Sequence, residues 1–225
     1  KKLDSVDQRQ LFSAVGQAKL INRYYELFRE HGIAVGQVLT TKENFSTRRH
    51  YLNQKNCMTV MLENGVIPIV NENDTVATHE IEIGDNDTLS AIVASMIGAD
   101  LLILLSDIDG LYTDDPRANP DAEFIETVEH LDESFLPEIS QKYLNMGKET
   151  SGSSVGTGGM SAKLAAARIA TDSGADMVIA NSKDVRIIHR IIDGENYGTL
   201  FLAEKQDAFD LPDFVENLHS CRERG

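Results

Sequence analysis

Five consecutive apolar residues, Leu101 to Leu105, form the segment that most restricts the fold of this chain. A run of this length without a polar side chain is typical of a strand buried on both faces, as in a parallel sheet. Stretches with helical spacing precede and follow it, and parallel strands need such crossover connections. The segment therefore predicts an α/β fold in which helices cover both faces of a mostly parallel sheet, a three-layer α/β/α sandwich.

The rest of the 225-residue chain repeats this alternation of strands and helices. Further strands are predicted at residues 33–39, 66–70, 177–180 and 198–202. Helices are predicted at residues 11–28, 51–63, 88–97, 161–170 and 185–192. Pro68 lies inside the second of these strands, which argues against a central position for that strand. Residues 107–137 are rich in Asp, Pro, Asn and Glu, so we expect a hairpin or extended loop there.

Composition excludes several classes of protein. The chain is 41% hydrophobic and 25% charged, as expected for one globular domain, and its net charge of −15 argues against a nucleic-acid surface. Cys57 and Cys221 form no Cys-x-x-Cys pattern, and the six histidines have no metal-ligand spacing, so we expect no metal held by protein ligands. No stretch reaches about 18 apolar residues, and no signal peptide opens the sequence. We therefore expect a cytoplasmic protein that binds neither nucleic acid nor membrane.

A glycine-dense segment, residues 151–160, leads directly into a helix that carries Lys163 in its first turn. Glycines allow backbone N–H groups to converge on an anion, and the helix start adds unpaired N–H groups and a positive dipole end. A lysine is unfavourable at this end of a helix unless an anion is present, so the pattern predicts a phosphate site. The alternative is a flexible Gly/Ser connector before an ordinary surface lysine. The segment matches neither the P-loop nor the Gly-x-Gly-x-x-Gly pattern.

Three further loops at predicted strand ends or helix starts are dense in carboxylates and amides, namely residues 71–75, 84–88 and 106–112. Open α/β sheets bind ligands at such loops. Each loop also has a structural explanation. Asp87 could cap the helix that follows it, Asn71 or Asp74 could form an Asx-turn, and Asp109-Gly110 could be a simple turn. Together with Lys163, the loops offer both signs of charge, which a polyphosphate and an amino acid need.

These segments, in this order, closely resemble the amino acid kinase family, and within it the branch that acts on glutamate. The resemblance rests on four stretches and extends to about Phe201: residues 66–76, 84–91, 99–112 and 156–163. It implies ATP-dependent transfer of a phosphoryl group, with Mg²⁺, to the side-chain carboxylate of L-glutamate. The product would be L-glutamyl 5-phosphate, in the first step of proline biosynthesis. The resemblance also implies a homo-oligomer, a dimer or tetramer, with proline as a feedback inhibitor.

The resemblance also implies roles for individual residues. Asp74 and Asn86 would hold glutamate, with Asn71 and Asp85 nearby. Lys163 would stabilise the charge of the transferring phosphoryl group, and Asp87 would orient the catalytic lysines. ATP would be held by Ser106, Asp107, Thr157, Gly158, Gly159, Met160, Ser161, Ala162 and Lys163. Because a carboxylate is already nucleophilic, catalysis reduces to alignment and charge neutralisation.

The sequence departs from the family at both ends. The family begins with a strand and a Lys-x-Gly-Thr/Ser loop, followed by a Ser-Ser-Gly-Ala loop, and neither occurs here. We therefore expect that an N-terminal part of the kinase domain precedes Lys1. Residues 1–203 are assigned to the kinase domain and residues 204–225 to an acidic, mobile tail with a short helix at residues 214–218. We expect no counterpart of the C-terminal domain of some family members within these 225 residues.

Two other functions remain open from the sequence. One is a kinase of the same fold for another amino acid or a nucleoside monophosphate, which a substrate profile would identify. The other is a nucleotide-binding module without catalytic activity.

Overall fold

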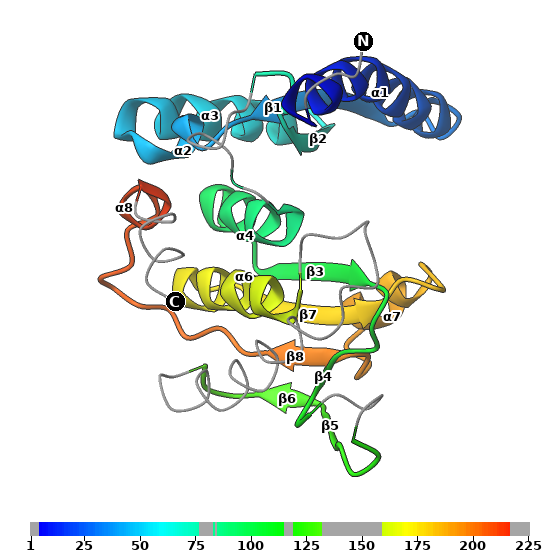
Figure 1. Cartoon of the computed structure of the whole chain (residues 1–225), viewed down its shortest axis with the longest axis vertical. Coiled ribbons are helices and arrows are strands. Elements are labelled where there is room, and N and C mark those ends of the chain that lie inside the picture. Colours follow the sequence, from blue (N-terminus) through cyan, green and yellow to red (C-terminus); the bar gives the residue numbers. More distant parts are fainter. Residues whose placement is uncertain (1–4, 77–82, 84, 115–118, 132–158, 217–225) are drawn as a thin grey trace. The chain divides into compact units, whose positions relative to one another are not determined.

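A computed structural model describes residues 5–76, 83, 85–114, 119–131 and 159–216 (Figure 1). The chain forms two compact units. The first unit contains residues 1–84 together with residues 210–225, and the second contains residues 85–209. The predicted division into a kinase domain, residues 1–203, and a tail stays a prediction.

Two parallel strands with helices packed against them form the first unit. Helix α1 (Ser5–Arg29) contacts β1 (Ala34–Thr40), and α3 (Arg48–Glu63) contacts β2 (Val66–Glu72). The strands pair from Ala34 opposite Val66 to Thr40 opposite Glu72. Helix α3 begins where the Thr47 side chain accepts a hydrogen bond from the His50 N–H. The predicted strands and α3 agree with the structure to within three residues at each end. Helix α1 starts six residues before the predicted residue 11, and the single turn α2 (Glu43–Ser46) was not predicted.

Helix α8 (Leu211–Glu216) also belongs to the first unit, although it comes from the other end of the chain. It packs against α2, and Leu211 and Val215 are buried. The Lys42 ammonium donates a hydrogen bond to the Glu216 carbonyl oxygen (3.1 Å). The helix starts three residues earlier than predicted, because the apolar spacing of Leu211 and Val215 places both on one buried face.

A four-stranded sheet forms the centre of the second unit, in the order β3-β7-β8-β6. Strand β3 (Leu101–Ser106) is parallel to β7 (Asp176–Asn181), β7 is antiparallel to β8 (Thr199–Phe201), and β8 is parallel to β6 (Thr127–Val128). A separate hairpin pairs β4 (Leu111–Tyr112) with β5 (Phe124–Ile125). The mostly parallel α/β arrangement confirms the predicted fold class within this unit. The short strands β4 to β6 confirm the sparse structure expected after Asp107.

The most buried strand of the second unit is β7 rather than β3. Residues 177–180 are all buried, whereas Leu104 is the buried residue of β3 and Leu105 is 36% exposed. Among the described strands β3 lies at the end of the sheet, while β7 has a neighbour on each side. The expectation that Leu101 to Leu105 would be fully buried is therefore wrong, because apolar content alone does not give a strand's position in the sheet.

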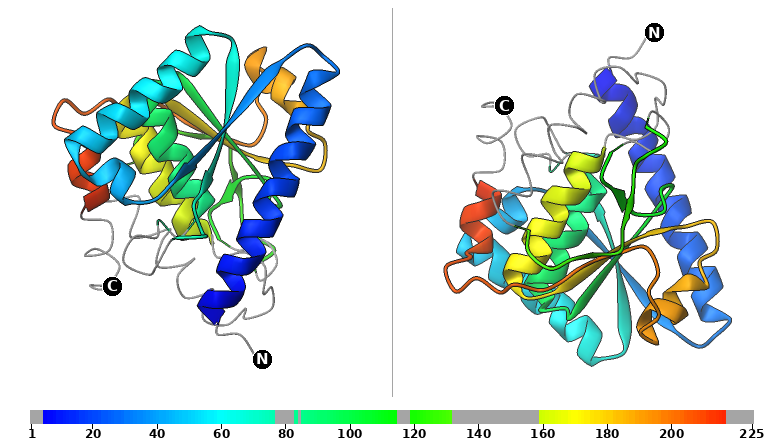
Figure 2. Two further views of the ribbon diagram at one scale, coloured as in Figure 1. Left: turned by 90° about the horizontal axis from the view of Figure 1, so that it is seen from above. Right: turned by 90° about the horizontal axis from the view of Figure 1, so that it is seen from below.

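Two helices precede the parallel strands of this unit and turn back directly into them. Helix α4 (Asn86–Ile97) ends at Gly98 (φ 67°) before β3, and α6 (Met160–Ser173) ends at Gly174 (φ 97°) before β7. These left-handed positions favour glycine, which lets the chain reverse. The two helices pack side by side (Figures 1 and 2). Because each helix runs back into its strand, both helices start at the edge where β3 and β7 end.

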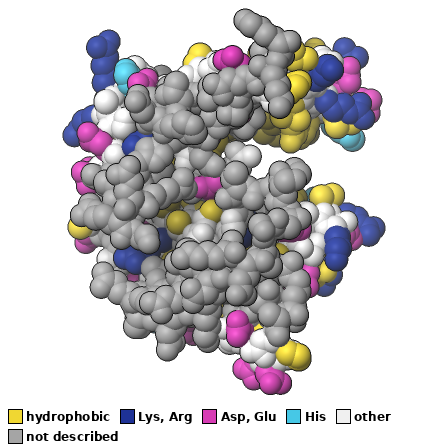
Figure 3. Space-filling model, viewed as in Figure 1, with side chains coloured by type: hydrophobic (Ala, Val, Ile, Leu, Met, Phe, Trp, Pro, Cys, Tyr) yellow, Lys and Arg dark blue, Asp and Glu magenta, His cyan; other side chains and the backbone are white. Residues whose placement is uncertain are grey.

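Helix α7 (Ile187–Ile192) covers part of this sheet. Ile187 and Ile191 form a buried cluster with Val178 and Ala180 of β7. Among the coloured residues of Figure 3, Lys and Arg side chains lie beside Asp and Glu side chains.

Candidate active site

The start of α4 is fixed by Asp85. Its carboxylate accepts hydrogen bonds from the Thr88 N–H (2.6 Å) and the Thr88 hydroxyl (3.0 Å), and the residue is 8% exposed. Asp85 is therefore the helix cap, so the alternative that Asp87 caps this helix is wrong. This leaves the Asp87 carboxylate in the first turn of α4 for another partner, while the preceding Asn86 is exposed.

Asp87 forms an ion pair with Lys163, and this contact is the one that a carboxylate expected to orient a lysine would make. The Lys163 ammonium lies 2.8 Å from the Asp87 Oδ2 atom, and the two side chains are 10% and 20% exposed. A buried ammonium is costly unless it is paired, so Asp87 makes this position possible for a lysine. The alternative of an ordinary surface lysine is wrong. The pair holds a cation at the start of α6, where helix N–H groups also favour an anion.

The glycine-dense loop is described only from Gly159 onward, so Thr157 and Gly158 lie outside the described residues. Gly159 is the residue before α6 and is extended (φ −71°, ψ −177°) with no side chain to cap the helix. Met160, Ser161 and Ala162 form the first turn of α6. The Ala162 N–H donates a hydrogen bond to the Gly159 carbonyl oxygen (3.0 Å), so Met160 and Ser161 carry the N–H groups of this turn that can face an anion.

Ser106 and Asp107 follow at the end of β3. The Ser106 hydroxyl donates a hydrogen bond to the Asp107 carboxylate (3.2 Å), and Asp107 is exposed. Since α4 and α6 start at the edge where β3 ends, the fold gathers Asp87, Lys163, Ser106 and Asp107 along one edge of the second unit.

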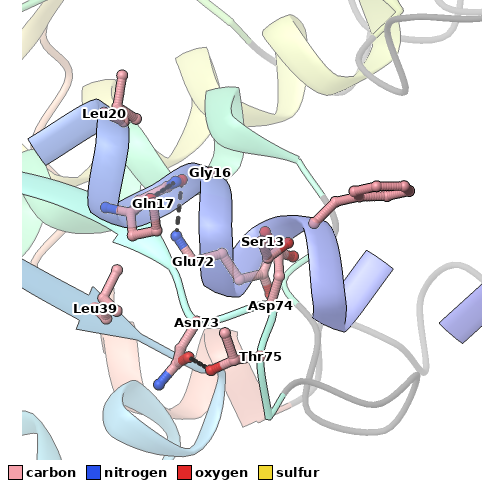
Figure 4. A pocket seen from close by; sticks show the side chains of 11 residues that line it. Ser13, Gly16, Gln17, Leu20, Leu39, Glu72, Asn73, Asp74 and Thr75 are labelled. Atoms are coloured by element: carbon pink, nitrogen blue, oxygen red, sulfur yellow. Dashed lines mark hydrogen bonds between the residues drawn. The ribbon is translucent and has the colours of Figure 1, made fainter. Parts of the chain in front are cut away.

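The first unit holds a separate pocket of about 360 Å³ (Figure 4). Residues 71–75, the end of β2 and the loop after it, form one wall, and Ser13, Gly16 and Gln17 of α1 contribute another. Asn71 and Asp74, both predicted to bind substrate, line this pocket and are half-buried. The structure therefore brings these two predicted residues together within the first unit.

Gln17 is a pocket residue that the sequence analysis missed. Its side-chain oxygen accepts a hydrogen bond from the Asn71 amide (3.0 Å), which ties α1 to the end of β2, where the loop begins. Glu72, which is 9% exposed, accepts a hydrogen bond from the Ile83 N–H (2.6 Å) and so fixes the same loop. Nothing in the local sequence links Gln17 to Asn71, since 54 residues separate them.

The described part of the chain offers neither a metal cluster nor a membrane span. It contains no cluster of three or more His, Cys, Asp or Glu side chains able to hold a metal ion. None of the helices within the described ranges has the length and apolar content required to cross a bilayer.

Comparison with known proteins identifies the class to which this fold and site belong. Residues 1–181 match the Amino acid kinase family, and the chain belongs to that family.

Within this family, the chain is similar to several curated glutamate 5-kinases. The chain is 62% identical over 188 residues to a glutamate 5-kinase of Bacteroides thetaiotaomicron, covering 84% of this chain and 49% of that protein. It is 46% identical over 202 residues to a glutamate 5-kinase of Clostridium acetobutylicum, covering 90% and 72%. It is 44% identical over 200 residues to a glutamate 5-kinase of Escherichia coli, covering 89% and 52%. The chain thus spans about half the length of two of these three relatives.

Solved structures support the fold alone. A UMP kinase from Ureaplasma parvum has a TM-score of 0.52 at 13% identity and covers 88% of this chain and 71% of its own. An isopentenyl phosphate kinase has a TM-score of 0.51 at 19% identity, covering 88% and 74%. These similarities confirm the predicted amino acid kinase fold.

Proposed function

We propose that the protein transfers the terminal phosphoryl group of ATP to the side-chain carboxylate of L-glutamate. The product is L-glutamyl 5-phosphate, and the reaction is the first step of proline biosynthesis. The observation that carries this proposal is the buried Lys163–Asp87 pair at the starts of α6 and α4. Support for the substrate comes from the relatives named glutamate 5-kinase, one of which is 62% identical over 84% of the chain.

The chemistry needs little beyond alignment and charge. The glutamate carboxylate is the nucleophile, so no side chain has to remove a proton before the attack. Lys163 stabilises the negative charge of the phosphoryl group in flight, and Asp87 holds the ammonium in place. A lysine fixed before ATP arrives needs no reorganisation in the transition state.

The remaining predicted residues divide between the two substrates. Asp74 and Asn86 hold glutamate, with Asn71 and Asp85 supporting their loops. The first turn of α6, with Ser106 and Asp107, holds the phosphates and the rest of ATP, together with Thr157 and Gly158.

Mg²⁺ accompanies ATP in this proposal. Magnesium in kinases is usually bound through substrate phosphates, one or two carboxylates and water, and not by a full protein cage. The carboxylate of Asp107 is exposed and of the right type for such a partial site. When bound, the metal neutralises phosphate charge.

The alternatives from the sequence are less favoured. The UMP and isopentenyl phosphate kinases share only the fold, at 13% and 19% identity, whereas the glutamate 5-kinases are 44–62% identical. A module without activity has no need to bury a lysine beside an aspartate. We further propose a cytoplasmic homo-oligomer, a dimer or tetramer, that proline inhibits.

Replacement of Lys163 tests the proposal. In the protein as its gene encodes it, K163A is expected to lower kcat by about a hundredfold or more with little change in either KM, because the lysine acts mainly in the transition state. ADP release would be measured with and without glutamate. K55A, which removes an exposed lysine of α3, serves as the matched control and should retain full activity. Unchanged kcat in K163A, or ADP release independent of glutamate in the unmodified protein, would refute the proposal.

A further inference from the structure

The loop that leaves β3, residues 106–110, is held by hydrogen bonds from a distant part of the chain. The sequence analysis assigned Ser106 and Asp107 to ATP and interpreted Asp109-Gly110 as a simple turn. In the structure, Asp109 and the backbone of Ser106 are both bonded to the end of β7, which the sequence analysis did not connect with this loop.

The first attachment follows from the strand register. Ser106 lies opposite Asn181 in the parallel pair of β3 and β7. The Asn181 amide donates a hydrogen bond to the Asp109 carboxylate (2.7 Å), while its oxygen accepts one from the Lys183 N–H (2.9 Å). The Ser182 N–H donates to the Ser106 carbonyl oxygen (2.7 Å). Asn181 therefore bridges two loops, using both its donor and its acceptor.

The second attachment holds the other end of the loop. The Thr199 hydroxyl is fully buried, accepts a hydrogen bond from the Leu111 N–H (2.8 Å) and donates one to the Ile125 carbonyl oxygen (2.6 Å). Gly110 (φ 155°) passes so close that a Cβ atom there would lie 2.6 Å from this hydroxyl. The start of the loop is held at the Ser182 N–H and its end at Thr199, so the Asn181 side chain is the attachment of Asp109 between them.

We propose that Asn181 is a positioning residue for the nucleotide, which it serves by holding Asp109 and thus the backbone around Ser106 and Asp107. This inference rests on the proposed function, since it takes ATP as the ligand of the loop. Without the amide, the Asp109 carboxylate loses this hydrogen bond and can move toward incoming phosphates, which shifts the backbone that carries Asp107. A hydrogen bond to a charged group supports about a tenfold change in affinity.

The main variant is N181A. We expect its KM for ATP to rise about tenfold, with KM for glutamate unchanged and kcat altered less than threefold. Direct titration with ATP and Mg²⁺ should show the same loss of affinity. Circular dichroism would report whether the variant is folded. N22A removes an exposed amide-to-carboxylate hydrogen bond of similar type on α1, Asn22 to Glu26 (3.1 Å), and should leave all constants unchanged.

An exchange of donor and acceptor provides a sharper test. N181D places two carboxylates together and should raise the ATP KM more than N181A does. The double variant N181D/D109N reverses the hydrogen bond, keeps the net charge and leaves residue 181 able to accept from Lys183. It should restore the ATP KM to within about threefold of the original value. Because it retains the bridge, it also tests the inference if N181A fails to fold.

The outcomes separate the two proposals. Equal rises in both KM values, an unchanged ATP KM in N181A, or no recovery in the double variant would overturn the role of Asn181. If the unmodified protein binds ATP but does not phosphorylate glutamate, the proposed function fails. The titration with ATP then still decides whether Asn181 positions the nucleotide loop.

Discussion

Gly198 offers a quantitative test of the β7–β8 connection, because its position leaves no room for a side chain. Its φ of 76° lies in the left-handed region. A Cβ atom at this residue would overlap the Ile179 carbonyl oxygen and lie 2.9 Å from the carbonyl carbon. Both neighbours are backbone atoms of the buried strand β7, so neither can rotate away. G198A should therefore displace β8 from β7.

Gly194 provides a matched control four residues earlier. Its φ of 85° is similar, but a Cβ atom there would have nothing within 4 Å. The left-handed conformation should cost either alanine variant about 1–2 kcal/mol. The overlap at Gly198 should add about 1–3 kcal/mol, as overpacking of a core does.

The assay is thermal unfolding followed by circular dichroism at one scan rate. A difference of about 2 kcal/mol between the variants corresponds to about 4–8 °C in Tm for a chain of this size. We therefore expect G194A to unfold a few degrees below the unmodified protein and G198A about 4–8 °C lower still. Equal Tm values for the two variants would refute the reasoning, since they would mean that the overlap with β7 costs nothing.

Three further predictions concern the substrates and pH. D74A and N86A should each raise the KM for glutamate about tenfold or more, and far more than the KM for ATP, and equal effects on both substrates would reduce these residues to loop supports. Proline should compete with glutamate for the pocket beside Asp74, so inhibition in a steady-state assay should disappear as glutamate rises, and persistent inhibition at saturating glutamate would indicate a separate site. Burial, and then the Asp210 carboxylate, raises the pKa of Tyr51 above 10.0, so the folded protein keeps a proton that the unfolded chain loses. The free energy of unfolding should therefore fall as pH rises above about 10, and the urea midpoint of Y51F should fall less between pH 9 and 11; identical decreases would exclude Tyr51 as the cause.

Local sequence signals predicted where the helices of the second unit lie, with errors of up to three residues at their ends. Gly98 marked the end of α4 correctly, whereas α6 continues three residues beyond its predicted end, to Ser173. The unusual place of Lys163 in a first helical turn indicated that it needed an anionic partner. The structure supplies that partner as Asp87, which the family resemblance had implied.

Contacts between distant segments were not predictable in this way. Gln17 reaches Asn71 only because α1 packs beside the strands of its unit, and Asn181 reaches Asp109 only because β3 and β7 are neighbours. Thr199 is an ordinary strand residue in the sequence. Its buried hydroxyl fixes a loop only through Ile125 and Leu111, which lie 74 and 88 residues away. Periodicity and turn residues report on one element at a time, so they carry no information on which elements become neighbours.

The return of α8 to the first unit has a consequence for how the polypeptide matures during translation. The second unit is one continuous stretch of about 125 residues, so it can fold as soon as it has left the ribosome. The first unit must wait for Leu211 and Val215, which are synthesised after all of the second unit. At about 5–20 residues per second this delay is on the order of ten seconds. For that time the surface that α8 will cover remains open, which makes the early product a candidate client for chaperones that bind exposed apolar segments.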